Sequence, residues 1–332
     1  MPGSTPEFVT DRGVSNMVLN PKKIQQLAHN LASPATVEQE IAELKGRSLW
    51  QLARARFARN RAAMISLITL LLIVVFSIFG NSLSPWDHEQ IDWDAMGDVQ
   101  ALGAPSIQSR HYFGTDDLGR DLYARVIQGS QISLMVGLIG SLIAVVVGTL
   151  YGATAGYLGG RIDALMMRSV DILLAIPFMF VLILLMVMFG RSIYMIFIGI
   201  GLLSWLDMSR IIRGQTLSLK NREFIEAARA IGVRPLTIIT RHIIPNVLGI
   251  VVVYATLLVP GMIMTESFIS FLGLGVQEPQ TSWGALINEG ARTIQNGTLW
   301  QLLFPLAFFI VTLLSFYFIG DGLRDALDPK DE

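Results

Sequence analysis

The densest group of side chains that could do chemistry is His-Tyr-Phe-Gly-Thr-Asp-Asp-Leu-Gly-Arg-Asp, residues 111–121. Carboxylates interleaved with glycines can form a calcium-binding loop. The Asp-x-Asp-x-Asp-Gly rhythm of such a loop is absent, and no glutamate closes it at the required position. We therefore interpret the stretch as turn-forming: its two glycines supply permissive backbone, and Thr115, Asp116 or Asp117 caps the helix after it.

Enzymatic chemistry has little support in the rest of the chain. An intramembrane hydrolase needs a nucleophile and a base in one cavity, but His29, His88, His111 and His242 all lie outside the apolar runs. The absence of cysteine excludes thiolate nucleophiles, disulfides and cysteine-ligated metals. A Gly-x-x-x-x-Gly-Lys-Ser/Thr phosphate loop is also absent, so the chain cannot hold ATP in that manner. We expect no catalytic residue, no metal site and no cofactor bound by this chain.

Composition places the chain in a lipid bilayer. Hydrophobic residues make up 52% and charged residues 15% of the chain, and the mean hydropathy is +0.53, which is too apolar for a soluble domain of 332 residues. A formal net charge of -1 argues against a nucleic-acid partner. A helix needs about 20 residues to cross the hydrocarbon, and six apolar runs are long enough: Ala62–Gly80, Ile132–Tyr157, Leu165–Phe189, Ile193–Ile212, Val247–Leu272 and Leu299–Ile319. We predict an all-α, polytopic membrane protein with six transmembrane helices.

The distribution of basic residues predicts the orientation. Cytoplasmic loops carry an excess of Lys and Arg. All but five of the 25 Lys and Arg residues lie before the first span, between spans two and three, between spans four and five, or after span six. The five on the other side are Arg110, Arg120, Arg125, Arg191 and Arg292. Both termini and the loop of residues 213–246 are therefore predicted to be cytoplasmic.

A basic helix is predicted just before the first span. Ser48 is expected to cap it, and Trp50, Ala53 and Phe57 recur at helical spacing. One interpretation is an interfacial helix docked on the inner leaflet and in contact with membrane lipid. The other is a cytoplasmic extension of the first span whose arginines only set the orientation.

The cytoplasmic loop contains Glu-Ala-Ala-Arg-Ala-Ile-Gly, residues 226–232. We expect Asn221 to cap a helix that begins near Arg222, and Gly232 to end this helix in a left-handed conformation. A second short helix is expected to begin at Pro235. Pro245 fits the first turn of span five.

The first of these helices is predicted to present an apolar face. Phe224, Ala227, Ala228 and Ile231 recur at helical spacing, and Glu226 lies on another side. The two alanines would allow close approach, and the face suits a groove on another protein. The alternative is a helix that rests against its own bundle.

Polar and flexible side chains inside the spans are candidate pathway residues. Glu266 either lines a passage or is hydrogen-bonded to a neighbouring helix. Four methionines either form an adaptable lining or only pack: Met186, Met188, Met262 and Met264. Two ion pairs at helical spacing are expected near the cytoplasmic ends: Asp207 with Arg210, and Arg168 with Asp171. Three prolines can bend their spans: Pro177, Pro260 and Pro305.

At residues 226–245 the chain resembles the inner-membrane permease subunits of ATP-binding-cassette (ABC) importers. Their shared loop has Glu-Ala-Ala, three residues, Gly, nine residues and Ile-x-Leu-Pro. Here the last element is His-Ile-Ile-Pro, residues 242–245, which departs at its first position and is similar to the peptide-importer branch. Further stretches that look like this branch are residues 111–116, 119–121, 156–160, 270–275, 277–279, 282–284 and 320–325. The resemblance extends from about Gly46 to the C-terminus and is closest to oligopeptide-permease C subunits.

The resemblance implies a type I (MetI-like) permease fold and a division of labour in the bacterial inner membrane. Two different permease chains would pair about a pseudo-two-fold axis, two cytoplasmic ATPases would bind ATP and Mg, and a periplasmic binding protein would deliver peptide. The residues implied in ATPase coupling are Phe224, Glu226, Ala227, Ala228, Ile231, Gly232, His242 and Pro245. Glu266 and Met262 are the candidates for the substrate pathway.

Four parts are expected on this interpretation. Residues 1–60 would be a cytoplasmic tail with the basic helix, and residues 61–130 the first span with a periplasmic segment. Residues 131–320 would form the core permease domain, including the coupling loop, and residues 321–332 a cytoplasmic tail.

Two alternatives to an oligopeptide permease stay open. The same branch includes permeases for dipeptides, glutathione and nickel. A secondary carrier coupled to ions is a more distant alternative, since it would need carboxylates or broken helices near the midplane and commonly an internal repeat. The sequence shows one central carboxylate and no clear repeat.

Overall fold

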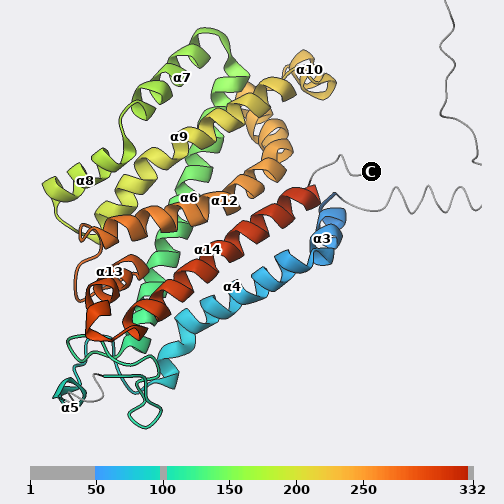
Figure 1. Ribbon diagram of the computed structural model, residues 1–332. Helices are drawn as coiled ribbons and strands as arrows, with labels where there is room; N and C mark the ends of the chain where they lie inside the picture. Colours follow the sequence, from blue (N-terminus) through green and yellow to red (C-terminus); the bar gives the residue numbers. More distant parts are fainter. Residues whose placement is uncertain (1–48, 98–102, 328–332) are drawn as a thin grey trace, which may run out of the picture. The chain divides into compact units, whose positions relative to one another are not determined.

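Figure 1 shows the computed structural model, which describes residues 49–97 and 103–327. Within these ranges every regular element is helical, and β-structure is limited to isolated bridges, which confirms the all-α prediction. By internal contacts the chain divides into residues 1–52 and 53–332. The longer helices belong to the second of these units: α4 (Arg61–Phe79), α6 (Leu122–Leu158), α7 (Gly160–Leu174), α8 (Phe178–Phe189), α9 (Ile193–Leu219), α12 (Ile244–Phe271), α13 (Trp283–Thr293) and α14 (Trp300–Leu327).

Five of the described helical stretches are long and apolar enough to cross a membrane: Arg61–Leu83, Leu122–Leu158, Ile193–Leu219, Pro235–Phe271 and Trp300–Leu327. The predicted span Leu165–Phe189 differs, because it is divided between α7 and α8, which are bent by 71°. Pro177 is the last residue of the break and directly precedes α8. Proline lacks an N–H donor and disfavours a helical residue before it, so the apolar run does not form one straight helix. The α12 and α14 helices, by contrast, continue through Pro260 and Pro305.

The basic helix before the first span is also present, as α3 (Leu49–Arg59). Ser48, its expected cap, lies outside the described residues. Asn60 separates α3 from α4, and its side-chain oxygen accepts the Ala63 N–H at 3.1 Å. The two helices are therefore separate elements, and both interpretations of α3 stay predictions.

The α6 and α9 helices approach each other closely along part of their length. Gly148, Gly152 and Gly156 form a seam on α6, and a Cβ atom added to Gly152 would lie 2.2 Å from the carbonyl oxygen of Ser209. Small residues four apart let helix backbones approach closely in membranes. Lys220, after α9, donates to the Gly156 carbonyl at 3.1 Å. This close contact fixes the position of α9, which leads into the loop of interest.

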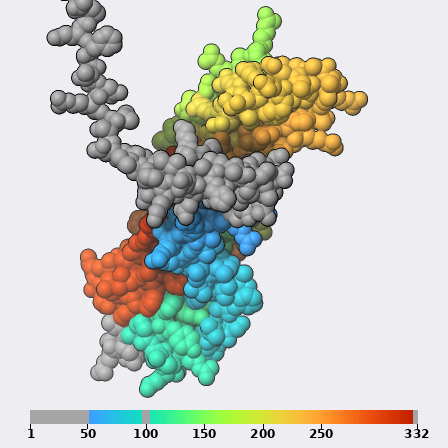
Figure 2. Space-filling view, turned by 90° about the vertical axis from the view of Figure 1, so that its right-hand side faces the viewer, coloured from blue at the N-terminus to red at the C-terminus, as the bar shows by residue number. Residues whose placement is uncertain are grey.

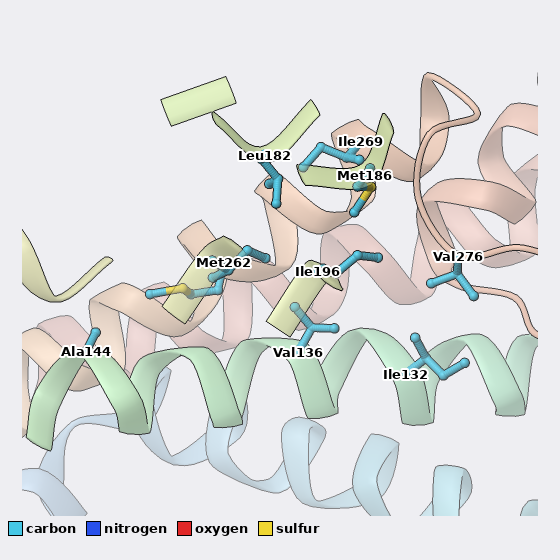
Figure 3. Packing of buried hydrophobic residues seen from close by; sticks show 10 residues of the cluster. Ile132, Val136, Ala144, Leu182, Met186, Ile196, Met262, Ile269 and Val276 are labelled. Atoms are coloured by element: carbon cyan, nitrogen blue, oxygen red, sulfur yellow. The ribbon is translucent and has the colours of Figure 1, made fainter. Parts of the chain in front are cut away.

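A buried apolar cluster lies among α6, α8, α9 and α12 (Figure 3). Val136 of α6, Leu182 of α8 and Ile196 of α9 are fully buried in it. Met262 of α12 belongs to the same cluster, and its sulfur lies 3.4 Å from the Ser204 hydroxyl. The cluster holds α12 against the α6–α9 pair.

The residues between α4 and α6 form an irregular segment that contains only short helical elements, α5 (Trp93–Gly97) and a 3-10 turn (Gly80–Leu83), in its described part. In Figure 1 this segment lies at the opposite end of the long helices from α10 (Glu223–Ala230). The cap of α6 is Asp121, whose side chain accepts the Ala124 N–H at 2.8 Å. The prediction of Thr115, Asp116 or Asp117 as the cap was therefore wrong, because these residues lie in the preceding turns.

Candidate functional site

The two ends of the α10 helix are formed differently. Arg222, not Asn221, is its first half-helical residue, and its carbonyl accepts the Ile225 N–H at 2.9 Å. The expected Asn221 cap was wrong by one position, and no side chain caps this end. Glu223 and Glu226 lie in the first turn, where their charges stabilise the positive end of the helix dipole.

At the other end Gly232 has a φ of +79°, which confirms the expected left-handed termination. Its N–H donates to the Arg229 carbonyl at 3.0 Å, and the Val233 N–H donates to the Ala228 carbonyl at 3.0 Å. These two hydrogen bonds define a Schellman motif, in which glycine avoids the steric penalty of a Cβ atom. The chain direction after α10 is therefore set by Gly232.

Two faces of α10 have different environments. Ile225 is fully buried and Ala228 is nearly so, and both pack with isoleucines of the following segment: Ile238, Ile239 and Ile243. Phe224 is 43% and Ile231 81% exposed, and Glu226, Ala227 and Gly232 are exposed as well. Ala228 was therefore placed on the wrong face by the sequence pattern. The helix both rests against its own bundle and presents apolar side chains outward, and Figure 2 shows this segment in yellow at the surface.

The segment after α10 runs into the membrane without a second turn. A short helix, α11 (Pro235–Ile238), begins with Pro235 as expected and continues through a π-helical turn (Ile239–Ile243) into α12. The stretch Pro235–Phe271 is thus one candidate span of 37 residues, longer than the predicted Val247–Leu272, and Pro245 lies in the first turn of α12 as expected. Pro245 has no N–H to donate, and the half-buried His242 has its carbonyl oxygen bonded by the Asn246 side chain at 2.6 Å. The wider π turn accommodates the proline where a regular α-helix would be strained.

Two ion pairs tie α7 to α9 near the same end. Arg213 contacts both carboxylate oxygens of Asp163, at 2.6 and 2.7 Å. Arg210 pairs with Asp171. The predicted pairs within single helices, Asp207 with Arg210 and Arg168 with Asp171, were wrong. Arg210 of α9 and Asp171 of α7 pair with each other instead. Asp207 is left with no ion pair or hydrogen bond in the described parts of the chain.

Glu266 is fully buried between α12 and α6. The hydroxyl groups of Ser133 and Ser270 donate to its carboxylate at 3.0 and 2.7 Å. The Ser133 hydroxyl in turn accepts the backbone N–H of Trp283 at 3.2 Å. In this structure Glu266 joins α6 and α12, as the hydrogen-bonded alternative predicts, and it is not among the residues that line either of the two cavities described below.

A cavity of about 190 Å³ lies at the end opposite to α10, and a second of about 360 Å³ lies among α7, α8, α9 and α12. Met262 lines the larger one, together with Ser204, Asp207 and Thr265. Met186 is buried in the core, whereas Met188 and Met264 are exposed. Of the four methionines considered, Met262 is the one that the cavity lining includes.

A partly buried charge network borders the smaller cavity. Arg125 contacts Asp116 at 2.5 Å and Glu289 at 2.6 Å, and Arg120 contacts Asp116 at 2.7 Å and Glu278 at 2.8 Å. The Arg120 hydrogen bond lowers the pKa of the Glu278 carboxyl. Sequence reasoning missed this network, because Arg125 and Glu289 are 164 positions apart and no local pattern relates them.

His111 lies nearby between two carboxylates. Its Nδ1 is 2.7 Å from Asp121 and its Nε2 is 3.1 Å from Asp92, and Trp86 stacks on the ring. Burial lowers the pKa of His111, but the hydrogen bonds and charges of Asp121 and Asp92 outweigh burial and raise it above its ordinary value. The residues that suggested a calcium loop therefore pair with each other, and no cluster with metal-ligand geometry occurs in the described ranges.

Two known protein families match the chain. Residues 144–330 match the family described as binding-protein-dependent transport system inner membrane component. Residues 48–105 match the N-terminal transmembrane domain of oligopeptide transport permease C. The first of these matches includes the α10 loop.

Three relatives illustrate the similarity. The oligopeptide transport system permease protein OppC of Escherichia coli is 59% identical over 88% of this chain and 95% of the relative. The protein of the same title from Haemophilus influenzae is 54% identical over 88% and 92%. The dipeptide transport system permease protein DppC of Bacillus subtilis is 42% identical over 85% and 86%. The chain therefore belongs to the inner membrane components of binding-protein-dependent transport systems, the multi-pass permease subunits of ABC importers, which are not themselves the ATPases.

Proposed function

We propose that this chain forms half of a translocation pathway for oligopeptides in the bacterial inner membrane, with both termini in the cytoplasm. Its partners would be a second, different permease, two ATPase subunits that bind ATP and Mg, and a periplasmic peptide-binding protein. The relatives with the higher identities carry oligopeptide titles. The dipeptide-permease title at 42% identity and a glutathione-permease title at 39% keep those substrates as the second candidates.

The observation that carries the proposal is the two-faced α10 helix. Its exposed side offers Phe224 and Ile231 to a partner, and exposed apolar side chains on a short helix suit a groove in another protein. Its buried side packs on the segment that continues into α12. A partner that moves α10 therefore moves a span directly.

The path of this movement can be followed along the chain. The continuous helix Pro235–Phe271 extends about 55 Å at 1.5 Å per residue. Met262 on this helix lines the larger cavity. Closure of ATPases bound at α10 would tilt this helix and change the cavity, which is how alternating access would result from ATP hydrolysis on separate subunits.

ATP dependence tests the proposed function. The complete complex, reconstituted in proteoliposomes with its binding protein, is expected to import radiolabelled peptide only with hydrolysable ATP. A non-hydrolysable analogue is the control and is expected to support no uptake. Uptake driven by a proton or sodium gradient without ATP would contradict the proposal and favour a secondary carrier.

A further inference from the structure

The larger cavity contains a carboxylate that its surroundings leave unsatisfied. Asp207 lies on α9 and lines the cavity. Arg210, one turn further on, pairs with Asp171 of α7, and Arg213 pairs with Asp163. Arg210 is the basic residue at helical spacing from Asp207, and it is engaged by Asp171. Asp207 is exposed in this chain, so its carboxylate is open to a ligand in the cavity.

The rest of the lining also provides acceptors. The Ser204 hydroxyl donates to the Ile200 carbonyl and the Thr265 hydroxyl donates to the Gly261 carbonyl, so each hydroxyl oxygen keeps lone pairs that can accept a hydrogen bond. The cavity lining includes no basic side chain, and its remaining residues are apolar, glycine or proline. The lining thus combines one negative charge with hydroxyl acceptors and apolar walls.

We propose that this cavity is a subsite for the ammonium group of a peptide in transit, with Asp207 as its counter-ion. An ammonium group carries three N–H donors and a positive charge, which matches a carboxylate flanked by hydroxyl oxygens. A cavity of about 360 Å³ is at the lower end of the range of about 300–1,000 Å³ for small-ligand sites, so it holds one end of a peptide rather than all of it.

The arrangement also assigns a direction to the substrate. The negative cavity accepts the amino end of a peptide and repels its carboxylate end. One wall, α12, continues to the α10 loop, so movement of that loop would reshape the subsite. This inference rests on the proposed peptide transport and adds to it the group that the chain recognises.

Three variants separate charge from shape at this position. Asp207→Asn removes the charge and keeps the size, whereas Asp207→Glu keeps the charge. Asp325→Asn is the matched control, because Asp325 is an exposed carboxylate on α14 outside the cavity lining. Each is assembled into the complete complex in proteoliposomes, and the binding protein is preloaded with a peptide or with its N-acetylated form.

Asp207→Asn is expected to slow import of the free peptide about tenfold, as for loss of one charge-assisted hydrogen bond. In Asp207→Asn, import of the acetylated peptide is expected to stay within about twofold of the parent. The same is expected of Asp207→Glu and Asp325→Asn with either peptide. Equal rates for both peptides in Asp207→Asn, whether unchanged or equally reduced, would overturn the inference. An equal reduction with weaker co-purification of the second permease would assign Asp207 to the contact between permeases.

A labelling experiment does not depend on import. The chain has no cysteine, so Thr265→Cys places its single thiol in the cavity wall. Free peptide is expected to slow maleimide labelling of this thiol in the assembled complex, acetylated peptide is not, and Asp207→Asn is expected to abolish the protection. Equal protection by both peptides would overturn the inference. Absence of any ATP-dependent import by the parent complex would instead contradict the proposed function itself.

Discussion

At the scale of single residues, Gly232 controls the geometry of the proposed coupling loop. Its positive φ lets two hydrogen bonds close the end of α10. A Cβ atom would meet no neighbour there, so a substitution would be penalised by backbone conformation alone. A substitution at Gly232 therefore tests the backbone conformation of the loop without changing its side-chain packing.

Gly232→Ala is expected to disturb α10 while the spans stay inserted, because a left-handed alanine costs about 1–2 kcal/mol. Co-purification of the ATPase subunits and peptide import should both fall. The control is Gly214→Ala on α9, where a Cβ atom also meets nothing within 4 Å but the backbone is helical. That control should keep parental binding; equal ATPase binding and import in both variants would remove Gly232 from the coupling role.

His111 predicts a pH dependence of the outer segment. Because its pKa is raised in the folded protein, the protonated form stabilises the contacts with Asp121 and Asp92 fully below its ordinary value of 6.5, and this contribution is lost as pH rises through the raised pKa. Asp92 has a lowered pKa, although its burial acts in the opposite sense, through its hydrogen bonds and charge interaction with His111. Its contribution is complete above 3.8 and is lost as pH falls through its lowered pKa.

Hydrogen exchange of residues 103–121 in the purified complex should therefore become faster as pH rises through the raised pKa of His111, after correction for intrinsic exchange. His111→Gln removes the titrating group and should give a flat corrected profile. A parent profile as flat as that of the variant would show that the histidine contacts do not stabilise the segment.

At the scale of elements, the faces of α10 make opposite predictions. Ile225→Ala removes a fully buried side chain, which costs about 2–5 kcal/mol in a packed core, so the thermal stability of the purified chain should fall. Ile231→Asp alters a side chain that is 81% exposed, so stability should be kept while ATPase co-purification falls. Thermal unfolding and co-purification are measured for both, and an Ile231→Asp variant that binds ATPases normally would contradict the assignment of the outer face.

The helical elements themselves were largely predictable from the sequence, because long apolar runs and glycine or proline punctuation are local signals. The failures have a common physical origin. Arg210 pairs across to Asp171 rather than along its helix to Asp207, and Ala228 faces inward because Ile225 and the isoleucines after α10 attract that side. Such choices depend on which helices become neighbours, and a single sequence does not state this.

At the scale of the whole molecule, the orientation of the chain can be tested directly. The absence of native cysteines allows single thiols to be placed at two strongly exposed positions, Ile107 and Ile231, at 85% and 81% exposure. In cells whose outer membrane has been permeabilised and whose inner membrane is intact, a membrane-impermeant maleimide should label Ile107→Cys but not Ile231→Cys. Inverted vesicles should give the reverse pattern. Labelling of Ile231→Cys from the outside would contradict a cytoplasmic coupling loop.

The glycine seam between α6 and α9 has a consequence for how such a transporter can move. At Gly152 the α6 backbone lies directly against the α9 backbone, and such close packing resists sliding, so we expect this pair to move as a single unit. A rotation that opens the pathway to one side of the membrane must therefore occur at less tightly packed positions. The bend between α7 and α8 at Pro177 is such a position, and it borders the cavity that Asp207 lines.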